Sequence, residues 1–480
     1  MARSNIFGKK QNEPWRGSSV SEENETTFHC SELITGCNLT GLLTLTEEEI
    51  ELAIYSYDAY FSIKPEEPIF VLTEKNDVVS LHSNVGNPPG QASRCIAPVR
   101  TIYRQDIISN IAVVGHDAWK SEDQIKCATF KVRHSDHLLR NKVKIDRIRR
   151  EEYPHEDDLT IYKDTIEGQS LGARYGVIYG PEFDHPKEIW PRYSIEFSPP
   201  TSLHEYIRHV SRYVRFLSFC LGSPLKPSAI RIDRLSFNER NSALEDQSYP
   251  GDHLVHYVWP EAKIDTHDLW VGGSPALVWE DDELIAFRAC LVAWMERAAG
   301  WDKAYTMMMT CLGLKREISA ERLVNACRWF EEIPLAGSRS ALTDADVEAI
   351  ATAAARQAEN LGHPPEIRSR IAGSIKRIKE ETAEERFRRL VKMVQGKFGE
   401  TCLPESAVAD LKQALAFRGK TAHGHYSPES DSEFNAFSRA VAAMEALCML
   451  LTAFELPLIA EGIMRMASNP VIRDYRHAIS

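Results

Sequence analysis

The chain has 480 residues, of which 43% are hydrophobic and 26% charged, so it is long and apolar enough for roughly two to four folded domains. This composition excludes a collagen, a coiled-coil rod and a wholly disordered chain. The formal net charge of -12 argues against a general attraction to nucleic acid or to anionic membranes, so any contact with RNA must come from a local basic patch.

The N-terminal segment, residues 1–27, is polar and has no apolar stretch, which predicts a flexible lead-in and no secretory signal. The cysteines show no C-x-x-C spacing, which predicts reduced thiols and a cytoplasmic location. The apolar stretch Val441–Met466 contains Glu445, Glu455 and Glu461, so it indicates a buried helix and not a membrane span. No membrane partner is expected.

Short β-type runs between residues 28 and 278 predict a β-rich N-terminal domain of the sandwich or barrel type. The clearest signal is a hairpin, in which Ile69–Leu72 and Val78–Leu81 flank a polar turn. One helix interrupts the strands. It starts at the capping-box pattern Ser202-x-x-Glu205 and continues with an apolar stripe as far as Leu221, so we expect it to pack on the sheet.

From residue 279 to 480 the apolar residues recur at helical spacing, which predicts an all-helical C-terminal domain after a linker near Gly272–Pro275. Ser430-x-x-Glu433 is the predicted cap of a long final helix from about Asp431. Residues 280–480 hold 26 basic and 29 acidic side chains, so this part is nearly neutral. The expected fold class is therefore α+β, with a β-rich domain followed by a helical one.

The predicted helix from Glu405 carries one residue that its apolar pattern does not explain. The stripe consists of Val408, Leu411 and Leu415. The next stripe position is Arg418, and a buried guanidinium costs free energy unless it is paired, faces a cleft or lines an interface. The plain alternative is an arginine that interacts with the helix dipole just before a stop at Gly424.

His423 follows Arg418 at a distance of five residues. Imidazole suits proton transfer near neutral pH and guanidinium suits a phosphoryl group, so the pair fits metal-independent RNA cleavage. On a continuous helix the two side chains diverge by about 140°. They can act together if the helix ends between them, or if each reaches the other copy across a two-fold axis.

The segment Leu415-Ala-Phe-Arg-Gly-Lys-Thr-Ala-His-Gly424 resembles the R-x4–6-H signature of HEPN domains, and in particular the ApeA-like group, whose motif runs Leu-x-x-Arg-Asn-x-x-Ala-His-Gly. Tyr193–Pro200, the helix at 201–221 and the segment 222–227 also resemble the N-terminal domain of that family. One departure is Gly419, where the family usually has a polar residue. A weakened or inactive site therefore stays an alternative.

The resemblance implies an anti-phage protein of the abortive-infection type. Its helical part would be a HEPN four-helix bundle with a helical insertion, and it would form a homodimer or a higher even-numbered oligomer. This part would cleave RNA, such as tRNA, without a cofactor, while the N-terminal domain would sense a phage protein as the activator. Arg418 would stabilise the phosphate and His423 would transfer protons. The alternative is an inactive HEPN module that binds RNA or a nucleotide, or serves as a scaffold.

Further basic and aromatic residues are weaker candidates for RNA contact. They are Lys420, His425 and Tyr426 beside the motif, and Arg386, Arg388 and Arg389 on the preceding basic helix. Alternatively, Lys420 and His425 are solvated residues at a helix end, and Tyr426 has a packing role. The arginines would then belong to an exposed helix with many salt bridges. The same choice applies to the basic window 131–150, for which a solvated surface is preferred.

Three groups of residues have the side chains of metal ligands. They are His253 with His256, His204 with His209, and Cys127 with His134 and His137. Because none is matched by a second pair at a recognised ligand spacing, the sequence predicts no metal site.

Overall fold

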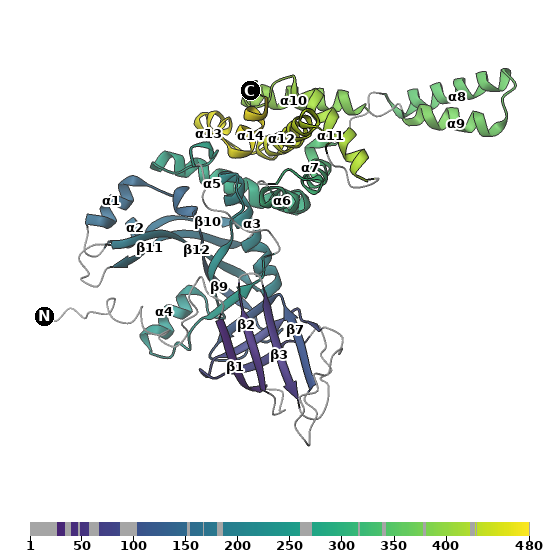
Figure 1. Cartoon of the computed structure of the whole chain (residues 1–480). Helices are drawn as coiled ribbons and strands as arrows, with labels where there is room; N and C mark the ends of the chain where they lie inside the picture. The colour runs from purple at the N-terminus through teal and green to yellow at the C-terminus, as the bar shows by residue number, and fades with distance from the viewer. Residues whose placement is uncertain are drawn as a thin grey trace. The chain divides into compact units, whose positions relative to one another are not determined.

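The computed structural model describes residues 26–33, 40–46, 49–56, 67–86, 103–150, 154–166, 168–179, 186–259, 271–314, 317–337, 342–377, 381–422, 428 and 430–479. Its contacts divide the chain into two compact units. The N-terminal unit takes the described residues up to Val214 and those between Leu225 and Pro260. The C-terminal unit takes Arg215–Pro224 and the described residues from Glu261 onward. Strands dominate the first unit and helices the second, which confirms the predicted fold class (Figure 1).

The strands are, in chain order, β1 (Thr26–Leu33), β2 (Thr40–Leu45), β3 (Ile50–Ser56), β4 (Ile69–Thr73), β5 (Val78–His82), β6 (Val85–Gly86), β7 (Tyr103–Ser109), β8 (Ile111–Gly115), β9 (Ile125–Val132), β10 (Thr160–Ile166), β11 (Gln169–Tyr179), β12 (Pro186–Thr201), β13 (Pro227–Asp233) and β14 (His253–Tyr257). These described strands form one sheet in the order β10-β11-β12-β9-β13-β14-β8-β5-β4-β1-β2-β3-β7-β6. Strands β14 and β8 are far apart in the sequence but are neighbours in the sheet. This pairing matters for a polar cluster described below.

One apolar core is shared by two groups of strands in this sheet. Leu43 of β2, Leu52 of β3 and Ile107 of β7 belong to the same buried cluster as Val79 of β5 and Val114 of β8. The sheet therefore bends around this core, as the barrel-like alternative requires. Figure 1 shows β1, β2, β3 and β7 side by side in this part of the unit. Each fully buried leucine or isoleucine there contributes about 1.5–3 kcal/mol to folding.

The hairpin predicted from the sequence is present as β4 and β5. Ile69 is opposite Leu81 and Leu72 is opposite Val78. The connecting turn places Asn76 at φ 64°, in the left-handed region that asparagine tolerates better than most residues.

The helix that interrupts the strands is α3 (Leu203–Leu221), and it crosses from the first unit to the second after Val214. Its N-terminal part packs on the sheet as predicted, because the ring of Tyr213 lies 4.8 Å from that of Tyr193 on β12 and 5.7 Å from that of Phe130 on β9. The other helices of this unit are α1 (Lys142–Arg150), α2 (Glu156–Leu159) and α4 (Phe237–Glu245).

The C-terminal unit contains, after the end of α3, the helices α5 (Asp281–Glu296), α6 (Ala298–Gly313), α7 (Ala320–Glu332), α8 (Asp344–Asn360), α9 (Pro365–Arg377), α10 (Ala383–Phe398), α11 (Ala407–Ala422), α12 (Asp431–Phe454), α13 (Ala460–Met466) and α14 (Pro470–Ile479). The hydroxyl of Ser430 accepts the amide N–H of Glu433, so the predicted cap of α12 is confirmed. The expectation that this is the final helix is wrong, since α13 and α14 follow. Neither has a long apolar stripe in the sequence.

Helices α7, α10, α11 and α12 contact one another, while α8 and α9 pair with each other between α7 and α10 in the chain. Residues Val441 to Ala453 of α12 are all buried. By length and composition alone α12 could cross a bilayer, yet 83% of its apolar window is buried inside the unit, as expected of a core helix.

A buried ion pair ties α7 to α12. The guanidinium of Arg322 donates to both carboxylate oxygens of Glu445, at 2.8 Å from Nε and 2.7 Å from one terminal nitrogen. Both side chains are at most 5% exposed. This pair explains the glutamate within the buried part of α12, because each charge satisfies the other away from water.

Candidate functional site

Arg418, the predicted phosphate-binding residue, lies one turn before the described end of α11. Its guanidinium donates to both oxygens of the Glu331 carboxylate on α7, at 3.1 Å for one of the two bonds. The Arg418 side chain is 33% exposed and that of Glu331 is 47% exposed. The hydrogen bonds to Glu331 raise the pKa of Arg418 above its ordinary value, so the guanidinium stays charged.

Arg418 lies at the border of the buried face of α11, not in its middle as the stripe predicted. The fully buried positions of the helix are Ala407, Leu411 and Ala414, followed by Phe417 at 4% exposure. From Ala414 onward, the buried face is therefore shifted by one residue from the stripe predicted from the sequence. Leu415 and Arg418 are both partly exposed as a result. The expected free-energy cost of a buried arginine is thus avoided, because Arg418 has both a carboxylate partner and access to water.

The end of α11 bears on how Arg418 and His423 could act together. The helix continues to Ala422, so it does not end in the first four positions after Arg418. His423, His425 and Tyr426 lie outside the described residues, and their roles stay predictions from the sequence.

Lys420 lies on the exposed side of α11, close to the start of α12. Its side chain is 58% exposed, and its ammonium nitrogen lies 3.9 Å from the carboxylate of Glu433. The same nitrogen lies 5.5 Å from the ring of Phe417, which makes an edge contact with Phe437 of α12. More than half of the Lys420 side chain is therefore exposed to solvent, with the carboxylate of Glu433 beside it.

The three arginines of α10 differ in how they are engaged. Arg386 lies over the ring of Phe330 at 4.5 Å and donates to the backbone carbonyl of Ala336. Arg389 is held by Glu381 and by the carbonyl of Gly337 at 2.9 Å. Both therefore fasten the segment after α7 to α10.

Arg388 is the most exposed of these arginines. Its side chain is 63% exposed and pairs with Glu384 one turn earlier at 2.9 Å. Such an exposed pair is worth little and can exchange for another anion. Of the α10 residues predicted to contact RNA, Arg388 is thus the one that is free to turn toward a ligand.

The chemical capacity of this site rests on the guanidinium of Arg418. Its planar fork binds a carboxylate through two parallel hydrogen bonds, and a phosphate can occupy the same position with the same geometry. Glu331 therefore blocks Arg418 and also marks where an anion binds. No pattern in the sequence points to Glu331, which lies 87 residues before Arg418 and on the exposed side of its own helix.

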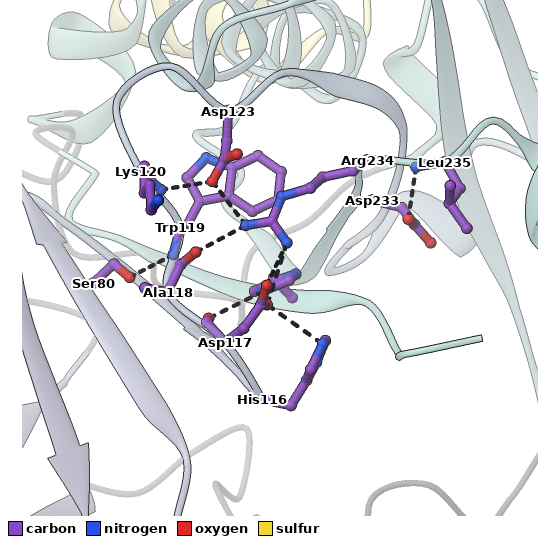
Figure 2. A network of polar contacts seen from close by, with 11 residues as sticks. Ser80, His116, Asp117, Ala118, Trp119, Lys120, Asp123, Asp233, Arg234 and Leu235 are labelled. Atoms are coloured by element: carbon purple, nitrogen blue, oxygen red, sulfur yellow. Dashed lines mark hydrogen bonds and ion pairs between the residues drawn. The ribbon is translucent and has the colours of Figure 1, made fainter. Parts of the chain in front are cut away.

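A second polar cluster lies in the N-terminal unit, among residues that the sequence did not single out together (Figure 2). His116 and Asp117 follow β8, and His253 begins β14. The side chain of Asp117 also pairs with Arg234, which follows β13. The only local signal was the adjacency of a histidine and an aspartate directly after a strand.

Comparison with known proteins identifies the N-terminal part of the chain. Residues 38–262 match the family model described as ApeA N-terminal domain 1. This range spans β2 to β14, including α3, and therefore nearly the whole strand-rich unit. No curated protein and no solved structure matched the chain.

Proposed function

We propose that the chain is an ApeA-like anti-phage defence protein and that its helical unit is a metal-independent HEPN endoribonuclease with Arg418 and His423 as catalytic residues. The single observation that carries the proposal from the structure is the guanidinium of Arg418. It is partly exposed, permanently charged and held by one exchangeable carboxylate.

The proposed reaction is an internal transfer within RNA. The 2′-hydroxyl attacks the adjacent phosphorus, its proton passes to a base, and the bond from phosphorus to the 5′ oxygen breaks. The leaving oxygen takes up a proton, so the products are a 2′,3′-cyclic phosphate and a 5′-hydroxyl end. His423 would move these protons, while Arg418 would stabilise the negative charge on the phosphoryl oxygens in the transition state.

The ion pair with Glu331 supports a resting state with low activity. A carboxylate that occupies both arms of the Arg418 fork competes with the scissile phosphate for the same donors. Because both side chains are partly exposed, the pair contributes only about 0–1 kcal/mol, and a modest rearrangement of α7 relative to α11 can break it. A defence nuclease needs such a restraint, since constant RNA cleavage would harm the host.

The remaining parts of the proposal concern partners and location. The N-terminal unit would recognise a phage protein and release the restraint, a cellular RNA such as tRNA would be the substrate, and the protein would act in the cytoplasm. Two copies would pair so that both motifs face one cleft, because side chains five residues apart, as Arg418 and His423 are, would diverge by about 140° if the helix continued. A homodimer or a higher even-numbered assembly is the proposed active form.

The proposal is tested in cells that carry the wild type, Arg418→Ala or His423→Ala, with and without phage. We expect protection from phage and new RNA ends bearing 2′,3′-cyclic phosphate in the wild type only. Sequencing of these ends would also identify the RNA substrate. Full protection by both variants would overturn the nuclease proposal.

A scaffold or binding module is the second candidate, and one observation favours it. Arg418 is tied to a carboxylate of its own chain, which is how a purely structural helix-end arginine behaves. Gly419, in place of the polar residue usual in the family, points in the same direction. If this second function is correct, protection will survive Arg418→Ala and no new RNA ends will arise. The purified protein will then bind RNA or a nucleotide without cutting it.

A further inference from the structure

Three side chains with metal-binding atoms, those of His116, Asp117 and His253, converge where β8 ends and β14 begins. Figure 2 shows His116 and Asp117 in this cluster. The Nε2 atom of His253 lies 2.7 Å from Oδ1 of Asp117, and the Nε2 atom of His116 lies 3.4 Å from the same oxygen. All three ligand atoms lie within 4.8 Å of one another. In the part of the chain that the structure describes, this is a group of histidine and carboxylate ligands that the proposed nuclease chemistry does not use.

Strand pairing brings these residues together. Leu254 of β14 is opposite Val114 of β8, so the first residue of β14, His253, meets the end of β8 at Gly115. A Cβ atom at Gly115 would lie 2.2 Å from the imidazole of His253. Glycine thus provides the space for this ring, and His116 and Asp117 follow immediately in the chain.

The environment of His253 holds its ring in place. Its side chain is only 3% exposed, and its ring makes an edge contact with Trp119 at 5.0 Å. The ring is therefore fixed with its Nε2 atom 2.7 Å from Oδ1 of Asp117.

Asp117 is oriented by an outer partner in the manner of a ligating carboxylate. Its Oδ2 atom accepts a hydrogen bond from Arg234 at 2.9 Å, and Oδ1, which faces the two histidines, accepts a longer one from the same nitrogen at 3.2 Å. Arg234 is itself held by Asp123 at 2.7 Å and lies over the ring of Trp119 at 4.6 Å. With two carboxylates around one guanidinium, the surroundings do not repel a cation. Partners of this kind fix the orientation of metal ligands.

We propose that Nε2 of His116, Oδ1 of Asp117 and Nε2 of His253 form a binding site for a divalent transition-metal ion of the zinc class. In a tetrahedral zinc site with bonds of about 2.0–2.1 Å, neighbouring ligand atoms lie about 3.3 Å apart. The separation between His116 and Asp117 matches this spacing at 3.4 Å, and that between His253 and Asp117, now 2.7 Å, must widen by about 0.6 Å.

Two further features agree with such a site. Two imidazole nitrogens with one carboxylate oxygen suit zinc or a similar ion, and they disfavour the hard cations magnesium and calcium. The side chains of His116 and Asp117 are 44% and 49% exposed, so an ion can enter and keep a fourth position open to water or to a partner. The sequence predicted no metal site because the ligands are distributed over two separate strands.

Binding of zinc to the full-length protein tests this proposal. After treatment with a chelator and dialysis, we expect calorimetric titration with Zn²⁺ to reveal one tight site per chain, with no comparable site for Mg²⁺. His116→Ala and Asp117→Asn should each weaken zinc binding at least about 10-fold. Both residues are exposed, so these changes avoid the folding risk of altering buried His253.

The matched control is His155→Ala, which removes an exposed histidine of the same unit outside the cluster. It should leave the affinity for zinc unchanged. As a second readout, Co²⁺ in the wild type should give the visible absorption of a tetrahedral site, and this absorption should be lost in His116→Ala. Equal zinc affinity in all variants, or the absence of a tight site in the wild type, would overturn the proposal and leave the cluster as a hydrogen-bond network.

Discussion

Arg418 near the end of α11 and Glu331 near the end of α7 form a two-armed ion pair at the surface of the helical unit. Sequence positions 87 residues apart thereby meet at the one arginine that the proposed nuclease chemistry requires. An exposed pair of this kind adds little to stability. Its consequence is instead competition, because an anionic substrate must displace Glu331 in order to reach both arms of Arg418.

The first prediction concerns the release of this restraint. We expect Glu331→Gln to increase RNA cleavage in the absence of phage and to slow the growth of the host, because a neutral amide holds the guanidinium less tightly. The change in folding free energy should remain within about 1 kcal/mol, since the pair is partly exposed. Growth curves and sequencing of RNA ends without phage would measure the effect.

The control for this experiment is Glu332→Gln, which makes the same change at the adjacent exposed residue of α7. It should grow as the wild type does. If Glu331→Gln also behaves like the wild type and retains phage protection, Glu331 does not restrain the site.

A second prediction separates the charge of Arg418 from its shape. Arg418→Lys keeps the positive charge but has no fork to bind two phosphoryl oxygens. We expect the rate of RNA cleavage by the activated protein to fall by about 10²-fold, in line with the loss of one preorganised donor in a transition state. Arg368→Lys, the same change in the ion pair with Glu359, is the control and should keep full activity. Retention of full activity by Arg418→Lys would show that charge alone is sufficient.

The sequence was a good guide where a local pattern decides the structure. The polar turn between two apolar runs predicted the β4–β5 hairpin, and Ser430 with Glu433 predicted the start of α12, because turn and cap chemistry depend on neighbouring residues. Helix α6 buries Trp301, Tyr305 and Met308, which recur at helical spacing and fit the helical pattern predicted for residues 279–480.

The candidate sites show the limit of such a reading. Arg418 could be found, because an arginine next to an apolar stripe is a local anomaly. Its partner Glu331 and the cluster of His116, Asp117 and His253 could not be found, because each depends on contacts between distant segments. Helix packing creates the first contact, and the register of β8 with β14 creates the second.

A third prediction concerns the buried pair of Arg322 and Glu445. We expect Glu445→Ala to lower the free energy of unfolding of the helical unit by about 3–5 kcal/mol, because it leaves the guanidinium of Arg322 buried without a counter-charge. Urea denaturation followed by far-ultraviolet circular dichroism would measure the loss. Replacing both residues, as Arg322→Met with Glu445→Leu, should recover most of it.

Glu359→Ala is the matched control for this prediction, since Glu359 forms an exposed ion pair with Arg368 and its side chain is 63% exposed. This change should cost at most about 1 kcal/mol. A similar cost for Glu445→Ala would mean that the charge on Arg322 finds other compensation.

The last prediction concerns acid sensitivity of the N-terminal unit. His82 on β5 is 7% exposed, and burial, reinforced by the charge of His204 on α3, lowers its pKa to about 4. A hydrogen bond with the backbone of Trp119 and the charge of Asp123 oppose this shift. Between the unfolded pKa near 6.5 and the folded value, the unfolded chain binds more protons, so stability is full above pH 6.5 and falls as the pH decreases toward 4.

For His82 alone, acidification from pH 7 to pH 5 should cost about 2 kcal/mol. Hydrogen exchange of the β5 peptide at the two pH values, corrected for the intrinsic exchange rate, would measure this loss of protection. His82→Gln should reduce the loss, since glutamine does not titrate, whereas His155→Gln at an exposed site should leave it unchanged. An equal loss of protection in the wild type and His82→Gln would assign the acid sensitivity to other groups of the unit.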